Sequence, residues 1–192
     1  MKLKVRRIVQ AFLSICVATV LSFLAGNRLA ITNYINQYTD VVLQSKEMVF
    51  YNWNLMDEDH YVSGEDPQII MNSIETYVNN LQIDAKLTDQ NTANKVMIYY
   101  TEEPGEEFSA EKCILADRSF LGKTKSIEIQ KKVYSIRLDL TEEENATLQF
   151  NAIQVNPRKF GFSVTDGLLL VVMLIGAATI FYYRKFLKNI YR

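Results

Sequence analysis

Residues 134–140 read YSIRLDL, a stretch in which apolar and polar side chains alternate. Successive side chains of a β-strand point to opposite faces, so this stretch has one apolar face and one polar face. The apolar face carries Tyr134, Ile136, Leu138 and Leu140. The polar face carries Ser135, Arg137 and Asp139. The alternation predicts a strand that buries one face in a core.

Four other stretches show the same period of two: LQIDAKL (81–87), VMIYY (96–100), SIEIQ (126–130) and TLQFNAIQV (147–155). In the last stretch the apolar positions shift from 148, 150 and 152 to 153 and 155, which predicts a β-bulge or a crossing between sheets. Turn-forming residues separate the strands at 88–91, 102–105 and 141–145. Short, regularly spaced strands predict an all-β sandwich. Before them, we expect a helical or irregular stalk to about residue 38, then one or two strands.

The two ends of the chain are expected to be membrane anchors. Residues 8–27 form a run of twenty uncharged residues, and residues 167–183 form a run of seventeen. At about 1.5 Å per helical residue, these runs approach the roughly 30 Å hydrocarbon thickness of a bilayer. We therefore predict transmembrane helices at 8–27 and 163–183, the second capped by Ser163 or Thr165. For the first run a cleavable signal peptide is the alternative, because the residues before it are basic.

Charge is segregated along the chain. Residues 1–7 and 184–192 each carry four Lys or Arg and no acidic residue. Residues 28–162 carry thirteen Lys and Arg against twenty-one Asp and Glu, a net charge of −8. By the positive-inside rule both basic tails are cytoplasmic, and residues 28–162 form an acidic extracytoplasmic domain with a short N-terminal stalk. The acidic charge argues against nucleic acid as a partner.

The positions of the two cysteines favour a bacterial over an animal protein. Cys16 lies in the first expected anchor and Cys113 is alone in the expected domain, so no disulfide forms within that domain. Small secreted animal domains usually depend on such bridges, and we therefore expect a bacterial plasma-membrane protein. Cys113 is expected to be a buried thiol, with an intermolecular bridge as the alternative.

Three stretches in order resemble a known kind of domain: GEDPQIIMNSIETYVNNLQIDAKL (64–87), KVMIYYTEEPGEEFSAEK (95–112) and VYSIRLDLTEEENATLQFNAIQV (133–155). Together they resemble the jelly-roll, carbohydrate-binding-module-like β-sandwich that accompanies bacterial membrane glycosyltransferases and other surface-polysaccharide machinery. In that family an Asp-Pro follows a Gly-polar turn, an I-x-Y-Y strand precedes F-S, and an I/L-R-I/L-D strand precedes the last strand. The matching positions are Gly64, Asp66, Pro67, Ile98, Tyr99, Tyr100, Phe108, Ser109, Ile136, Arg137, Leu138 and Asp139.

This chain departs from the family at two points. The family often continues R-I-D-P-G, whereas here Thr141 and three glutamates follow Leu140. No transferase domain accompanies the three stretches, so the resemblance implies an accessory module by itself. It also implies a partner in polysaccharide assembly.

The polar face of 134–140 is the candidate binding surface. Arg137 and Asp139 share a face, and a partly screened ion pair there contributes about 0–1 kcal/mol to stability. One interpretation is structural, with the pair covering the sheet and setting its register. The other is that Arg137 and Asp139 bind sugar hydroxyls while an aromatic ring covers the sugar. The aromatic candidates are Trp53, Tyr99 and Tyr100, with Tyr61 as a further aromatic residue.

Catalytic and metal-binding patterns are weak. Residues 57–60 (DEDH) offer carboxylate and imidazole ligands, but consecutive residues of a helix or strand do not converge on one ion. We expect a solvated acidic loop there. The glutamates around Pro104 and Gly105 indicate an exposed turn rather than a cleft. With one histidine and no G-x-S-x-G motif, the sequence predicts no enzyme activity, no catalytic residues, no metal and no cofactor.

Two classes of function fit these features. The first is a non-enzymatic, membrane-anchored accessory subunit of a bacterial cell-surface glycan pathway. Its sandwich would bind glycan or position a polytopic membrane protein, namely a glycosyltransferase, a flippase or another polysaccharide-assembly component. The second is a two-span structural or regulatory adaptor without glycan contact, such as a polysaccharide chain-length regulator. The small residues Gly176, Ala177 and Ala178 allow either pairing of the two anchors or docking to a larger membrane protein.

Overall fold

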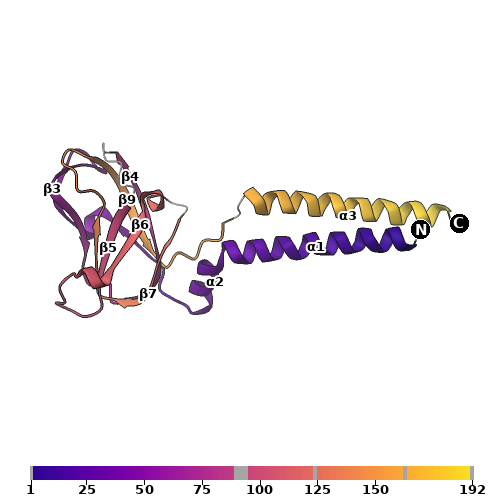
Figure 1. Ribbon diagram of the computed structural model, residues 1–192, viewed down its shortest axis with the longest axis horizontal. Helices are drawn as coiled ribbons and strands as arrows, with labels where there is room; N and C mark the ends of the chain where they lie inside the picture. Colours follow the sequence, from indigo (N-terminus) through magenta and orange to yellow (C-terminus); the bar gives the residue numbers. More distant parts are fainter. Residues whose placement is uncertain (1, 89–94, 123–124, 162–163, 191–192) are drawn as a thin grey trace. The chain divides into compact units, whose positions relative to one another are not determined.

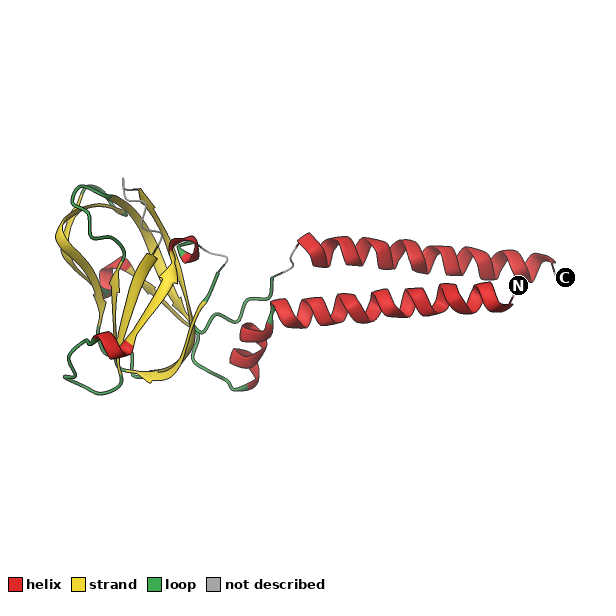
Figure 2. Ribbon diagram, viewed as in Figure 1, coloured by secondary structure: helices red, strands yellow, loops and turns green. Residues whose placement is uncertain are grey.

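The computed structural model describes residues 2–88, 95–122, 125–161 and 164–190. Ser163 and most of the expected turn at 88–91 lie outside these ranges. The chain divides into two compact units. One comprises Met1–Ile31 with Lys159–Arg192, and the other comprises Thr32–Arg158. The two long helices belong to the first unit and the strands belong to the second (Figure 1, Figure 2).

The first unit is a helical hairpin. Helices α1 (Lys2–Gly26) and α3 (Val164–Ile190) pack side by side (Figure 1). A methyl group at Gly176 would lie 2.9 Å from Phe12 Cδ2, so the absence of a side chain at Gly176 permits this contact. Asn27 ties the ends of the hairpin together, because its amide donates to the Gly161 carbonyl at 2.9 Å and its Oδ1 accepts from the Gly161 N–H at 2.7 Å. The two expected anchors therefore pair with each other.

Membrane spanning remains a prediction. Among the described residues, no single helix has both the length and the apolar composition of a membrane span. The bent pair Phe12–Gly26 and Arg28–Ile35 meets that criterion jointly, and Gly167–Thr179 is a shorter apolar helix.

The second unit is a mostly β domain, as the alternation predicted. The helix α2 (Arg28–Ile35) leads into it, where the sequence indicated a helical or irregular stalk. The strands are β1 (Val41–Gln44), β2 (Val49–Leu55), β3 (His60–Met71), β4 (Thr76–Thr88), β5 (Lys95–Thr101), β6 (Cys113–Asp117), β7 (Ile127–Val133), β8 (Ser135–Asp139) and β9 (Thr147–Val155). Single turns of 3-10 helix occupy η1 (Ser45–Glu47), η2 (Ala110–Lys112) and η3 (Arg118–Phe120).

The strand pairing is nested and antiparallel. β5 pairs with β6, β4 with β7, β3 with β8, and β1 with β9. This nesting, in which a long hairpin is rolled up, is the connectivity of a jelly roll. It produces one layer of β1, β9, β4 and β7 and a second layer of β2, β3, β8, β5 and β6. The layers are not two separate sheets, as a simple sandwich would have. β3 also pairs with β9, which joins them into one nine-stranded, nearly barrel-like sheet.

The sequence GEDP marks the place where β3 passes between the layers. Residues 60–62 of β3 pair with β9, whereas residues 69–71 pair with β8. Between these segments Tyr51 of β2 faces Gln68 and Trp53 faces Ser63, so that Asn52 alone stands opposite residues 64–67. Asp66 has a φ of +50° within this bulge. Bulges let a strand bend between sheets, so the Gly-polar-Asp-Pro turn is the corner of the domain.

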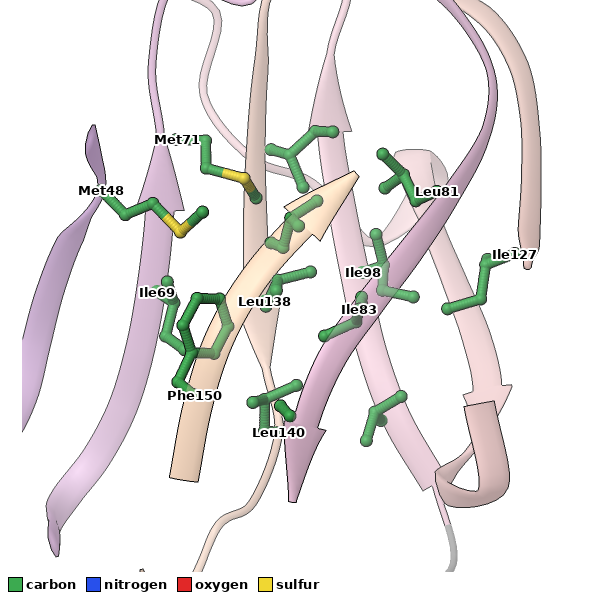
Figure 3. Packing of buried hydrophobic residues seen from close by; sticks show 14 of the residues in the cluster. Met48, Ile69, Met71, Leu81, Ile83, Ile98, Ile127, Leu138, Leu140 and Phe150 are labelled. Carbon is green, nitrogen blue, oxygen red and sulfur yellow. The ribbon is translucent and has the colours of Figure 1, made fainter. Parts of the chain in front are cut away.

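The apolar face of 134–140 lies at the centre of the core. Ile136 and Leu138 are fully buried and Leu140 is 2% exposed. Figure 3 shows Leu138 and Leu140 among Ile69, Ile83, Ile98 and Phe150, which come from strands of both layers. The predicted bulge in 147–155 is confirmed, because Asp84 pairs with Ala152 and Ala85 with Phe150, which leaves Asn151 unmatched.

A network of buried asparagines was not apparent in the sequence. Asn33 of α2 donates to Asn80 Oδ1 at 2.8 Å and accepts from Asn79 Nδ2 at 2.7 Å. Asn156 accepts from the Asn79 N–H at 2.7 Å and donates to the Tyr77 carbonyl at 2.7 Å. All four asparagines are buried, so each hydrogen bond replaces one that water would otherwise supply. The network fixes the last turns of α2 to the ends of β4 and β9.

Candidate functional site

The site is the outer surface of the layer formed by β2, β3, β8, β5 and β6, called here the outer face. Successive ladder pairs place one residue of each strand in a row across it: Val49, Ile70, Arg137, Tyr99 and Cys113. Their neighbours Ile69, Leu138 and Ile98 point the opposite way into the core. Arg137 occupies the central strand of this row.

The Arg137 side chain lies between two aromatic rings and a carboxylate. Its guanidinium carbon is 4.1 Å from the ring centroid of Tyr99 and 5.5 Å from that of Phe108. Its Nη2 donates to Asp139 Oδ2 at 2.9 Å. The side chains of Arg137 and Asp139 are 21% and 10% exposed. The prediction that the two share a face is confirmed, but the pair is much more buried than a screened surface ion pair.

Each member of the ion pair keeps one buried atom without a hydrogen bond. Among the described residues, neither Arg137 Nε nor Asp139 Oδ1 has a hydrogen-bond partner. A buried polar group without a hydrogen bond lowers the stability of the folded state by about 1–3 kcal/mol. The ion pair is therefore not an arrangement that maximises the stability of the sheet. Both atoms, Arg137 Nε and Asp139 Oδ1, lie beneath the outer face, while the partly exposed remainder of the Arg137 side chain reaches its surface.

Carboxylates surround this point. Burial is the main cause that raises the pKa of Asp139 above its ordinary value, and the Arg137 guanidinium opposes the rise. The negative charges of Asp66 and Glu142 raise the pKa of Asp139 further. Burial likewise raises the pKa of the Tyr99 hydroxyl, with a further contribution from Cys113. The Tyr99 hydroxyl also lies 3.4 Å from Met97 Sδ.

The three stretches that carry the family resemblance meet at this point. Asp66 comes from the corner of β3, where Gln68 Nε2 donates to its Oδ2 at 2.8 Å. Tyr99 comes from β5 and Phe108 from the loop that follows it. Residues 137 and 139 come from β8. Motif positions that are 73 residues apart in sequence, Asp66 and Asp139, therefore lie close enough to interact electrostatically.

The structure separates the five predicted site residues. Arg137, Asp139 and Tyr99 lie together on the outer face. Tyr100 faces the other way and packs against the core. Trp53 is 7% exposed and belongs to the core, as does Tyr61, which stacks on Phe50. Trp53 and Tyr100 are thus not part of this surface.

Sequence reasoning did not assign Asp66, Phe108, Met97 or Cys113 to the site. Asp66 and Phe108 stood at family motif positions, which was the available signal. The cross-strand register that brings Met97 opposite Asp139 and Cys113 opposite Tyr99 is a tertiary property.

The acidic loop between β2 and β3 brings three of its side chains together. Asp57 Oδ1 and Asp59 Oδ1 lie 2.7 Å and 2.8 Å from His60 Nδ1, so these near-consecutive residues do converge. Asp57 and Asp59 lie in the bend between β2 and β3, and this bend brings them to His60, the first residue of β3. The hydrogen bond to Asp57 is the main cause that raises the pKa of His60. As predicted, the loop is solvated, with the Asp57 and His60 side chains 64% and 47% exposed.

The glutamates around Pro104 and Gly105 form an ordered turn. The Glu106 carboxylate accepts from the backbone N–H groups of Glu102 at 2.7 Å and Glu103 at 3.2 Å. Its other oxygen pairs with Lys112. Residues 103–105 are exposed, as expected of a turn.

No protein-family model and no curated protein matches this chain. Among solved structures, a low-affinity xylan-binding module from Roseburia intestinalis is similar, with 13% sequence identity and a TM-score of 0.39. The similarity covers 61% of this chain and 94% of that module. At this identity and TM-score it says nothing about the ligand of this chain.

Proposed function

We propose that the chain is a membrane-anchored, non-enzymatic accessory protein of a bacterial cell-surface glycan pathway, and that its β domain binds glycan through the outer face. One observation carries the proposal. Two separate motif stretches, 95–112 and 133–155, bring a guanidinium, a carboxylate and two aromatic rings to one point of that face.

The chemistry of this point suits a sugar. Neighbouring sugar hydroxyls both donate and accept hydrogen bonds, and Arg137 donates where Asp139 accepts. The C–H face of a sugar ring is apolar and packs on aromatic side chains. Tyr99 and Phe108 flank the ion pair, and Tyr51 on β2 is 53% exposed on the same face. Ligand sites of this kind combine an aromatic lining with a few polar groups that set orientation.

The helical hairpin supports membrane attachment. Large apolar side chains are exposed along both helices, a surface that soluble proteins rarely leave open to water. These residues are Leu13, Val17, Val20, Leu21, Leu24, Val164, Leu168, Val171, Leu174 and Ile175. With basic residues at both ends of the chain, this surface favours insertion into a bilayer with both termini cytoplasmic. The β domain is then extracytoplasmic, and a polytopic component of polysaccharide assembly is its proposed neighbour.

Binding of the full chain to soluble polysaccharides tests the proposal. The protein in nanodiscs is titrated with β-glucan, xylan and mannan, and binding is followed by calorimetry. We expect Arg137→Ala to weaken binding at least about tenfold, because it removes the central donor. Lys131→Ala, an exposed cation on β7 in the other layer, is the matched control and should bind like the wild type.

Equal binding by the wild type and Arg137→Ala would overturn the site. Absence of any glycan binding would overturn the glycan function. If Arg137→Ala instead released a defined membrane protein that co-purifies with the wild type, the outer face would be a protein-docking surface.

A further inference from the structure

We infer that the outer face selects uncharged glycans, and that Asp66 and Glu142 are the residues that exclude acidic ones. This inference rests on the proposed function and deepens it by assigning the ligand class. It adds two specificity residues that do not belong to the Arg137–Asp139 pair.

The positive charge of the site is already neutralised. Arg137 would by itself be a good partner for a carboxylate, because a guanidinium binds carboxylates through parallel hydrogen bonds. Here Asp139 occupies its Nη2 at 2.9 Å. An acidic sugar would have to displace Asp139 or approach it closely, and Asp139 is 10% exposed with little room to withdraw.

Asp66 is held beside this pair by the corner of β3. Asn52 Nδ2 donates to the backbone carbonyls of Glu65 and Asp66, which stabilises the left-handed conformation at Asp66. Gln68 Nε2 fixes the Asp66 carboxylate at 2.8 Å. Ile69, the next residue of β3, pairs with Leu138, the residue before Asp139. The Asp66 carboxylate is therefore held near the site although Asp66 is exposed.

Glu142 is placed by the loop that follows β8. Ser63 Oγ donates to the Glu143 carbonyl at 2.6 Å and accepts from the Ala146 N–H at 2.8 Å. The Ser63 carbonyl accepts from the Asn145 N–H at 2.9 Å. These bonds hold the loop at the corner of the domain, three residues after Asp139. Here the chain departs from the resembling family, because Thr141 and three glutamates follow Leu140.

The site thus has three carboxylates, those of Asp66, Asp139 and Glu142, and one guanidinium, that of Arg137. The fields of Asp66 and Glu142 reach Asp139, since both raise its pKa. The same fields act on any anion bound there, and like charges at close range oppose binding. A neutral sugar experiences no such repulsion. The net charge of −8 on residues 28–162 acts in the same direction at longer range.

The test compares neutral xylan with polygalacturonate, a polymer of acidic sugars, on the full chain in nanodiscs at low salt. We expect the wild type to bind polygalacturonate at least about tenfold more weakly than xylan, with a smaller difference at high salt. Asp66→Asn with Glu142→Gln should raise the ratio of polygalacturonate binding to xylan binding about three- to tenfold. Asn tolerates the left-handed conformation at position 66, so the fold is retained.

The matched control is Glu58→Gln with Glu75→Gln, which removes two exposed negative charges elsewhere and should leave the ratio unchanged. A wild type that prefers polygalacturonate overturns the inference, as does a double variant with an unchanged ratio. Binding that depends on Arg137 without discriminating between the polymers overturns this inference alone. Absence of binding to any glycan overturns it together with the proposed function.

Discussion

The guanidinium carbon of Arg137 lies 4.1 Å from the ring centroid of Tyr99, its cross-strand partner on β5. This contact stacks the guanidinium of the Arg137–Asp139 ion pair over an aromatic ring. The pair is therefore more than a screened surface interaction, and its removal affects both the fold and the outer face.

Arg137 and Asp139 should be energetically coupled. Arg137→Ala and Asp139→Ala should each lower the free energy of unfolding by about 1–3 kcal/mol, because each leaves a largely buried partner unpaired. The double variant should lose less than the sum of the two. Trp53 is the single tryptophan and lies in the β core, so its fluorescence during denaturant unfolding of the full chain reports this domain. Additive losses would show that the two side chains act independently.

Substitutions on the core face of β8 should destabilise the domain more than a substitution on its opposite face. Ile136→Ala and Leu138→Ala should each cost about 2–5 kcal/mol, because both side chains are fully buried and leave cavities. Ser135→Ala on the opposite face should cost less than about 1 kcal/mol. Unfolding followed by Trp53 fluorescence measures all three. Equal, small losses at the three positions would contradict the assignment of the faces.

Asn156 should be required for the buried asparagine network. Asn156→Ala should lower the free energy of unfolding by about 2–4 kcal/mol, since it removes the hydrogen bonds that Asn156 makes with the Asn79 N–H and the Tyr77 carbonyl. Asn156→Asp keeps the acceptor but loses the donor, so it should also destabilise. Asn151→Ala, at the exposed bulge of β9, is the control and should have a small effect. A tolerated Asn156→Ala would mean that the network is dispensable.

The single histidine should titrate above its ordinary pKa of 6.5, because the Asp57 carboxylate accepts a hydrogen bond from the protonated ring. The folded state therefore favours protonated His60. Its contribution to stability is complete below pH 6.5 and is lost as the pH rises through the folded pKa. Proton NMR of the His60 ring measures this value directly. Asp57→Asn should lower the pKa toward 6.5, whereas Glu58→Gln should change it little. A wild-type value at or below 6.5 would refute the contact in solution.

The membrane orientation can be tested by labelling. Cys16 and Cys113 are first replaced by serine, and a single cysteine is then placed at Glu103, an exposed residue of the β domain, or at Lys188. From the charge segregation we expect an impermeant thiol reagent to label position 103 in intact cells, and position 188 only after the membrane is opened. Labelling of both positions in intact cells would contradict the proposed topology.

The local features of the domain could be predicted from the amino-acid sequence. Alternation identified β4, β5, β7, β8 and β9, and a shift of phase indicated a bulge or a crossing between sheets within 147–155, because these properties depend on neighbours along one strand. It also identified the small residue at 176 that allows the two long helices to touch. Arg137 and Asp139 were recognisable as a pair since they lie two residues apart on one strand.

Only the tertiary structure decided which residues surround that pair. The register of β5 and β3 against β8 brings Tyr99 and the corner carrying Asp66 to Arg137, while Trp53 and Tyr100 are turned into the core. A one-residue change of register would reverse every one of these positions. The convergence of Asp57, Asp59 and His60 and the four buried asparagines depend likewise on a hairpin and on strand ends that meet in space. Such contacts join residues far apart in the chain or turned by a tight loop, and no local periodicity encodes them.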